Sequence, residues 1–223
     1  NSDQRAYWDD TMTTEQHYGI LEFVPGGGDK ERVVVDGNKQ EWTEEQLITV
    51  ENEIKLYAES DSAYLYLMLE KPGIDWEQEK ITVPIDVTPG SGSKVYNNYN
   101  LKRGADFVIE INGKENSRML VHEYYDRYEY AYAEYLGGNP QNLISMRGGA
   151  EASGNQFEDI LYMLEKEIRL PDTGEVIPVQ NFNAGKLKFG TADFNSEYYD
   201  SLTDYCFEGD VLEIRIPWQL INV

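Results

Sequence analysis

Short runs in which apolar and polar residues alternate set the strongest limit on how this chain folds. In residues 81–87 every second residue is Ile or Val, and residues 107–111 and 211–216 repeat the same period of two. Such a period places successive side chains on opposite faces of a β-strand. Turn signals such as Asn112-Gly113 separate the runs, and no helical segments alternate with them. The pattern predicts an all-β, antiparallel, jelly-roll-like sandwich with long inserted loops.

Three segments allow finer predictions about single strands. Residues 63–70 read AYLYLMLE and are apolar on both faces, which is typical of a strand in the middle of a sheet. Pro84 has no backbone N–H to donate, so its strand is expected at a sheet edge or at a bulge. Residues 157–170 fit a strand and also the apolar face of a helix. We favour the strand, which turns at residues 171–174 and returns through residues 176–179.

The length of 223 residues fits one large β domain with a sizeable core. Residues 1–30 read as a lead-in segment that contains the flexible run PGGG. Regular strand signals begin at residues 32–35 and stop at an Asp-Gly turn, so we expect the domain itself to span residues 31–223. A long loop at residues 88–104 interrupts the domain, and long loops inside a compact domain are often functional.

The formal net charge of −22 limits the classes of partner. Acid on this scale repels nucleic acid phosphates and anionic lipid head groups, so neither is an expected partner. No stretch reaches the roughly 18 to 20 apolar residues that a membrane span needs, so no direct insertion into a membrane is expected. The charge fits a neutral or cationic ligand or calcium, and it equally fits a solvated surface that keeps the chain soluble.

The residue types and motifs that many enzymes use are sparse. Cys206 is the only cysteine, which excludes an internal disulfide, and a catalytic thiol would need His17 or His122 beside it. We expect Cys206 to be a buried, inert thiol. No nucleophile elbow, zinc-protease motif, P-loop or dinucleotide fingerprint is present. With 41 acidic residues, some carboxylate pair lies at glycosidase distance by chance, so such a pair is no evidence of catalysis.

Aromatic residues in polar surroundings are the candidate sugar-binding residues, because a sugar ring stacks its C–H face on an aromatic ring. One candidate residue lies in the polar loop 72–77. Others lie in the Asn- and Tyr-rich loop 88–104 and on one face of the tyrosine-rich run 124–135. Each also has a purely structural interpretation, as a cap on a sheet edge or as cross-strand packing. The five aromatic candidates are Trp76, Tyr96, Tyr99, Tyr128 and Tyr130, and Asn98 is a sixth candidate whose planar amide can bind sugar hydroxyls.

A calcium site requires several oxygen ligands at close range. Asp75, Glu77 and Glu79 are spaced by two residues, so on an extended segment their carboxylates share a side. These three residues are the candidate calcium ligands. No EF-hand pattern is present anywhere in the sequence.

Three segments, in this order, carry a resemblance to a known family. Residues 34–42 hold a short strand, an Asp-Gly turn and then Trp42. Residues 54–67 hold a strand, an acidic turn and a Tyr-Leu-Tyr strand, and residues 212–218 end in Ile-Pro-Trp. Together they resemble the family 9 carbohydrate-binding modules and the wider group of DOMON-like sandwiches. The resemblance does not extend to residues 88–205, where loops would build a ligand site.

The resemblance implies a non-catalytic β-sandwich that binds polysaccharide or oligosaccharide, often with calcium as a structural ion. It also implies an extracellular or cell-surface location, as one part of a larger secreted or surface bacterial protein. Asp36, Trp42 and Trp218 are then fold determinants. The haem-binding branch of the DOMON-like group uses a Met and a His as haem ligands. Nothing in this sequence pairs a Met with a His in that way, so no haem is expected. Two alternatives remain, a structural or protein-interaction sandwich without a sugar site and a polysaccharide-processing enzyme or a domain of a glycosyltransferase or hydrolase.

Overall fold

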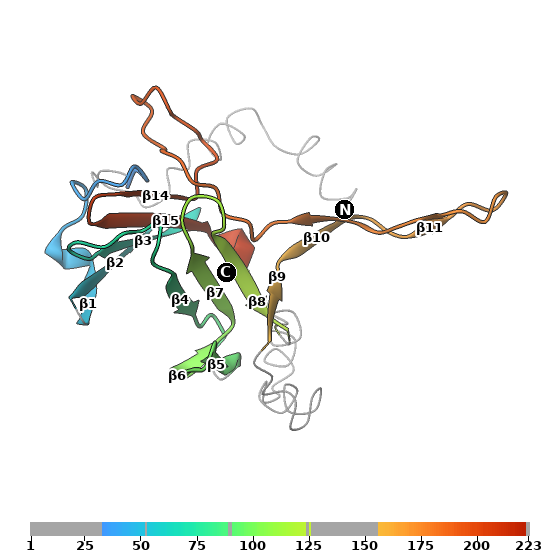
Figure 1. The fold of residues 1–223 in the computed structure, drawn as a ribbon, viewed down its shortest axis with the longest axis horizontal. Coiled ribbons are helices and arrows are strands. Elements are labelled where there is room, and N and C mark those ends of the chain that lie inside the picture. The colour runs from blue at the N-terminus through green and yellow to red at the C-terminus, as the bar shows by residue number, and fades with distance from the viewer. Residues whose placement is uncertain (1–32, 52, 89–90, 124, 126–155, 222–223) are drawn as a thin grey trace, which may run out of the picture.

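Regular structure in this protein is almost entirely β. The described helices are two single 3₁₀ turns, η1 (Glu44–Gln46) and η3 (Trp218–Ile221). Two larger antiparallel sheets lie against each other, as Figure 1 shows, so the predicted all-β, sandwich-like fold is confirmed. The computed structural model describes residues 33–51, 53–88, 91–123, 125 and 156–221.

The first sheet has five strands, and the strand that is apolar on both faces lies in its middle, as predicted. Its two central strands, β3 and β15, pair over their whole length, from Glu70 opposite Val211 to Tyr64 opposite Pro217. In spatial order the strands are β1 (Leu47–Glu51), β2 (Ile54–Ser60), β3 (Tyr64–Glu70), β15 (Val211–Pro217) and β14 (Tyr205–Glu208).

The second sheet has four strands, and its outermost described strand carries Pro84. That strand pairs with one neighbour among the described residues, so the prediction of an edge strand is confirmed. The Asn112-Gly113 turn joins the two central strands into the predicted hairpin. In spatial order the strands are β4 (Ile81–Ile85), β7 (Phe107–Ile111), β8 (Arg118–His122) and β9 (Phe157–Asp159).

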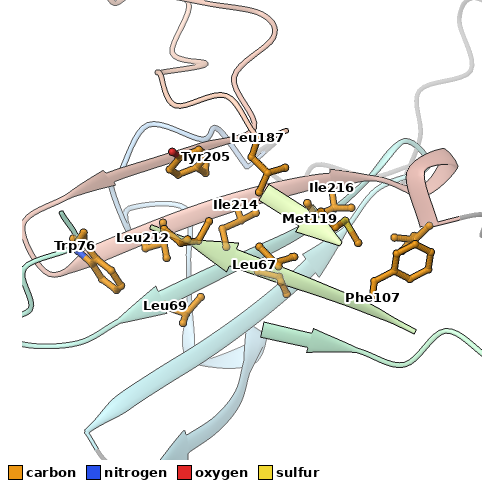
Figure 2. Close-up of a cluster of buried hydrophobic side chains, with 13 residues drawn as sticks. Leu67, Leu69, Trp76, Phe107, Met119, Leu187, Tyr205, Leu212, Ile214 and Ile216 are labelled. Carbon is orange, nitrogen blue, oxygen red and sulfur yellow. The ribbon is translucent and has the colours of Figure 1, made fainter. Parts of the chain in front are cut away.

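The hydrophobic core lies between the inner faces of the two sheets (Figure 2). The alternating residues Leu212, Ile214 and Ile216 of β15 are each 0 % exposed, as their period of two predicts. Core side chains therefore come from strands that are far apart in sequence but face each other in space. The buried members are Leu67, Leu69, Trp76, Phe107, Ile109, Ile111, Met119, Leu187, Tyr205, Leu212, Ile214, Ile216 and Ile221.

A segment of the chain that comes before β1 covers the outer face of the five-stranded sheet. Val33, Val35 and Trp42 of this segment pack against side chains of β2, β3 and β14, Cys206 among them. The prediction of a strand at residues 32–35 is wrong over the described residues 33–35, because this segment crosses a sheet face and does not join a sheet edge. It is held there by apolar burial and by contacts such as the hydrogen bond from the Ala192 N–H to the Val35 carbonyl.

A small hairpin covers the outer face of the four-stranded sheet. Its strands are β5 (Ser93–Tyr96) and β6 (Tyr99–Ala105), and its two turn residues have positive φ angles of 45° and 69°. Both turn residues are Asn, which tolerates this left-handed conformation better than most residues. The hairpin buries Tyr96 and Ala105 against Val108 and Leu120.

Residues 157–170 form strands, so the preference for strand over helix is confirmed. After β9 the chain leaves the sandwich as a long two-stranded arm that extends away from both sheets (Figure 1). The arm turns at residues 171–174 and returns, as predicted. Its strands are β10 (Leu161–Glu165), β11 (Ile168–Arg169), β12 (Val176–Ile177) and β13 (Gln180–Asn183).

Candidate functional site

Trp76, predicted to be an exposed sugar platform, is a core residue. Its side chain is 3 % exposed, its indole N–H donates to the Gly209 carbonyl at 3.0 Å, and its ring lies 6.5 Å from that of Phe207. The prediction is wrong because the loop folds back over one end of the sandwich. The backbone N–H groups of Gln78 and Glu79 both donate to the Asp75 carbonyl, and this turn directs the ring inward.

The second group of predicted sugar-binding residues is divided by the structure. Tyr96 is 7 % exposed, and its hydroxyl donates to Glu110 Oε1 at 2.5 Å, so this ring cannot stack on a ligand and its prediction is wrong. Tyr99 is 72 % exposed and Asn98 is exposed in the turn beside it. Sugar binding by these two residues stays a prediction, and together they offer one exposed ring and one amide.

Two further candidates, Tyr128 and Tyr130, lie outside the residues that the structure describes. The predicted calcium ligands are described, and they do not gather. The Asp75 carboxylate accepts the Glu77 N–H at 3.0 Å, Glu77 pairs with Lys114 at 3.3 Å, and Glu79 pairs with Lys71 at 3.2 Å. This ligand set is wrong because residues 75–79 form a turn, whereas the prediction assumed an extended segment.

Within the described part of the chain, three carboxylates do gather at Asp36, Glu41 and Glu213, with one oxygen from each inside a 4.8 Å group. Glu213 is 0 % exposed, and both of its oxygens already accept hydrogen bonds. Oε1 accepts from the Trp42 indole at 2.6 Å, and Oε2 accepts from the Asp36 and Gly37 N–H groups at 2.9 and 2.8 Å. Glu213 therefore clamps the covering segment to β15, and calcium stays a prediction without an assigned ligand set.

Two buried glutamates, Glu213 and Glu110, each bind one of the two segments that cover the outer sheet faces, and the groups around the two carboxylates differ. Burial raises the pKa of Glu213 to about 7, against the opposing effect of its three neutral hydrogen-bond donors. Burial also acts on Glu110, which holds the β5–β6 hairpin, but Lys80, Tyr96 and Arg118 bind its oxygens and hold its pKa below the usual value. Both groups secure the fold, and only Glu213 is set to titrate near neutral pH.

The prediction of a buried Cys206 is confirmed. Its side chain is 7 % exposed, and burial raises the pKa of the thiol to about 12. A thiol with so high a pKa carries almost no thiolate at neutral pH. Such a thiol is a weak nucleophile.

The most exposed aromatic surface among the described residues is a loop that the sequence did not single out. Residues 190–203, which we call the aromatic loop, connect the return of the arm to β14 and project from the sandwich (Figure 1). Phe194 is 81 % exposed, Tyr198 is 76 % exposed and Tyr199 is 44 % exposed. The rings of Phe194 and Tyr199 meet edge to face, with centroids 5.6 Å apart and planes at 71°.

The tip of the aromatic loop is shaped by its own short polar side chains. The Asp193 carboxylate accepts from the Asn195 backbone N–H at 2.9 Å and from the Asn195 amide at 3.2 Å. Ser196 follows, and its hydroxyl accepts the Tyr198 N–H at 3.1 Å. Such Asx and Ser turns fix the backbone without any regular strand or helix. The aromatic rings are therefore presented on a defined turn.

The base of the aromatic loop is tied to the sandwich by charged residues. Lys188 pairs with Asp200 at 2.5 Å, and the Asp200 N–H donates to the Thr191 carbonyl at 2.8 Å. From β15, the Arg215 guanidinium donates to the Ser201 carbonyl at 2.6 Å and to the Thr203 carbonyl at 2.5 Å. Gly190 fits only because it has no side chain, since a Cβ there would lie 2.6 Å from Thr203 Oγ1. These contacts fix both ends of the loop.

Rigid, exposed aromatic rings next to amide and carboxylate groups suit a ligand with one apolar face and several hydroxyls. Asn195 and Glu197 are exposed beside the rings and have planar polar groups for such hydroxyls. A sequence signal for this surface was present. Residues 193–200 read DFNSEYYD, which interleaves aromatic with Asn, Ser and Asp residues in the same way as the loop at residues 96–100.

Comparison with known proteins adds no assignment. No family model, curated protein or solved structure matches this chain. None of the helices in the described residues is long and apolar enough to cross a membrane.

Proposed function

We propose that this protein is a non-catalytic carbohydrate-binding module that binds polysaccharide or oligosaccharide on the aromatic loop. The observation that carries the proposal is the exposure of Phe194 and Tyr198, at 81 and 76 %, on a loop whose backbone is hydrogen-bonded from tip to base. Large exposed apolar surfaces on a folded domain often mark binding sites. A rigid site also loses little conformational entropy when a ligand binds.

The chemistry of the loop favours a neutral sugar over other ligands. The net charge of −22 disfavours anionic ligands at any exposed site of this chain. A pyranose presents a C–H face to an aromatic ring and hydroxyl groups at its edges, and each hydroxyl both donates and accepts hydrogen bonds. Asn195 and Glu197 supply the partners for those hydroxyls.

The wider setting is part of the same proposal and rests on the resemblance to family 9 carbohydrate-binding modules. It comprises an extracellular or cell-surface location, a place within a larger bacterial protein, and calcium as a structural ion. Glu213 connects two of the segments that carry the resemblance, because it lies near the start of the last segment and its carboxylate binds Gly37 and Trp42 of the first. This contact accounts for a Glu at that place in the closing strand.

A glycan array with and without calcium, followed by calorimetry on the best oligosaccharide, tests the proposal. Phe194→Ala and Tyr198→Ala should each weaken binding by about fivefold or more, since stacking on an aromatic ring contributes about 1 to 3 kcal/mol and a sugar lies near the lower end. Tyr99→Ala is the matched control, because Tyr99 is a comparably exposed tyrosine in another part of the fold, at the start of β6. Loss of binding in Tyr99→Ala with unchanged binding in the two loop variants would contradict the proposal and move the site to the β5–β6 turn.

A further inference from the structure

The outer strands of the two larger sheets differ in how their free edges are protected. Residues 188–190 run beside β14 and bridge to it at Tyr205. The outer strand β4 carries Pro84, which has no N–H to donate. The outer strand β9 has three residues, and the last two are exposed acids. A covering segment, a proline and a charged side chain are common means by which proteins block pairing at a sheet edge.

Among the described residues, β1 has no such protection. It lies at the outer margin of the five-stranded sheet, and in the described part of the chain it pairs with β2 alone (Figure 1). Its five residues contain no proline and no charge before the last one, Glu51. Ile48 and Val50 are 63 and 57 % exposed. β1 therefore presents unpaired backbone groups and two apolar side chains, which are the features that an added strand binds.

Acidic residues stand at both ends of β1. Two belong to η1, which precedes the strand, one ends the strand and one follows it in the turn to β2. The four exposed acids are Glu44, Glu45, Glu51 and Glu53. The base that faces β1 from β2 is Lys55, which lies opposite Val50 and already pairs with Glu70 at 3.6 Å. The edge is therefore apolar in its middle and negative at both ends.

We propose that the free edge of β1 binds an extended segment of a partner protein, with apolar residues in the middle of the segment and Lys or Arg at both ends. The segment pairs with β1 as an additional strand, so backbone hydrogen bonds supply affinity and side chains supply selection. Ile48 and Val50 contact its apolar side chains, and its basic ends meet the acids. The edge shares no residue with the aromatic loop, so a protein partner here is independent of a sugar on the loop.

The same charges select against a second copy of this chain. In an antiparallel pair of β1 strands, the start of each strand lies beside the end of the other. Both ends are acidic, so such a pair brings acids against acids twice, and like charges in facing positions destabilise a sheet. The net charge of −22 on each copy adds to the repulsion. A segment with two basic ends makes these contacts attractive in either strand direction.

Two peptides that differ only in the charge of their ends test the proposal on the whole chain. Both have the alternating middle Val-Thr-Val-Thr-Val, flanked on each side by Lys-Lys in one peptide and by Glu-Glu in the other. Calorimetry should show that the lysine peptide binds, and that the glutamate peptide binds at least about tenfold more weakly. Added salt should weaken the lysine peptide, because screening acts over about 8 Å at physiological salt. No binding of the lysine peptide, or equal binding of both, would overturn the proposal.

Hydrogen exchange followed by NMR locates the bound peptide. The lysine peptide should slow the exchange of those β1 amides that point away from β2, because they gain hydrogen-bond partners. The signals of residues 47–51 should shift, and those of the aromatic loop should not. Protection at the arm or at another sheet edge, with none at β1, would contradict the proposed site.

Substitutions in β1 and its turn test the two kinds of contact. E51K/E53K reverses the charge at one end, so it should weaken the lysine peptide by about fivefold or more and strengthen the glutamate peptide. Val50→Thr replaces an exposed methyl group by a hydroxyl of similar size and should weaken the lysine peptide by about threefold. Both changes are at exposed positions, so the melting temperature should stay near that of the wild type.

Matched controls make the same changes on the arm. E165K/E167K and Val176→Thr also alter exposed residues, and they should leave peptide binding unchanged. Edge variants that bind the lysine peptide as tightly as the wild type does would overturn the proposal. Sedimentation velocity tests the other occupant, because a wild-type dimer that Val50→Thr dissociates would also overturn the proposal and identify a second copy at this edge.

Discussion

Two turns of this protein have the same hydrogen-bond pattern, but one carries a buried aromatic ring and the other an exposed one. In the first, the Asp75 carboxylate accepts the Glu77 N–H at 3.0 Å, and in the second the Asp193 carboxylate accepts the Asn195 N–H at 2.9 Å. Each turn is closed by a backbone hydrogen bond from the third residue after the aspartate, and each places an aromatic residue directly after the aspartate. The ring of Trp76 is 3 % exposed, and the ring of Phe194 is 81 % exposed.

The difference shows that a turn fixes the direction of a side chain and that its place in the fold decides what the side chain meets. The Trp76 turn lies over one end of the sandwich, where Phe207 and Gly209 receive the ring. The Phe194 turn stands at the tip of a loop that projects from the sandwich, where the ring meets only Tyr199 of its own loop among the aromatic contacts of the described residues. The first ring stabilises the fold, and we propose that the second binds a ligand.

The largest expected effect belongs to the buried ring. Trp76→Ala leaves a cavity next to Phe207 and an unpaired Gly209 carbonyl, so the free energy of unfolding should fall by about 3 to 5 kcal/mol. Urea denaturation monitored by fluorescence measures this loss. A loss below about 1 kcal/mol would mean that the ring is not part of the core, and the comparison between the two turns would fail.

A pH titration should change the stability of the sandwich without changing glycan binding by the aromatic loop. The folded-state pKa of Glu213 is about 7 and its ordinary value is 4.5, so the folded state binds the proton more tightly than the unfolded state does. The stabilisation is fully present below the unfolded pKa and is lost as the pH rises through 7. Between about pH 5 and 8 the free energy of unfolding should therefore fall by up to about 3 kcal/mol.

Glu213→Gln is the control for this titration, because glutamine cannot ionise. The variant should lose the stability change between about pH 5 and 8, although it is less stable overall because its amide nitrogen cannot accept the hydrogen bonds that one carboxylate oxygen accepts. Glycan binding by the wild type should stay constant across the same pH range, since the oxygens of Glu213 bind Asp36, Gly37 and Trp42 and not the aromatic rings of the loop. A pH-dependent stability that persists in Glu213→Gln would assign the titration to another group.

Removing the aspartate that holds each turn should give smaller effects than Trp76→Ala. In the Trp76 turn the effect should be on stability, and in the Phe194 turn it should be on glycan binding. Asp75→Ala should lower the free energy of unfolding by about 1 kcal/mol, because the turn that it holds carries a core ring. Asp193→Ala should change stability little and weaken glycan binding, because it frees the backbone that presents Phe194. Thermal unfolding and calorimetry on both variants measure the two outcomes. Equal effects of the two substitutions on stability would contradict the difference in role.

The smallest expected effect on stability belongs to the exposed rings. Phe194→Ala and Tyr198→Ala should change the free energy of unfolding by less than about 0.5 kcal/mol, which is usual for surface positions without a structural role. Urea denaturation of both variants beside Trp76→Ala measures it. A loss as large as that of the buried tryptophan would show that the aromatic loop is part of the folded body.

Much of the fold could be predicted from the sequence because strand patterns are local. The period of two in β15 and the doubly apolar β3 follow from which residues face which side, and the structure has both as expected. The segment before β1 could not be predicted in this way. Its valines look like a strand, but burial on a sheet face satisfies them equally well.

The candidate site was harder to predict because exposure is a property of the whole fold. Trp76 and Tyr96 lie in polar stretches of sequence, yet both are buried and reach a hydrogen-bond partner, in one case a carbonyl 133 residues away and in the other a glutamate 14 residues away. Phe194 and Tyr198 lie in an equally polar stretch, but both side chains stay exposed, and Phe194 contacts the ring of Tyr199 in its own loop. Composition marks all of these residues as candidates, and only the tertiary structure separates them.

The most direct test of the account is an NMR titration of the aromatic rings. Protein labelled at Phe and Tyr side chains is titrated with the oligosaccharide that binds best on the array, and the ring signals are assigned through single substitutions. The account predicts that Phe194 and Tyr198 shift on binding while the buried Tyr96 and the distant Tyr99 do not. Shifts confined to Tyr99, or saturated binding with no change at Phe194 and Tyr198, would contradict it.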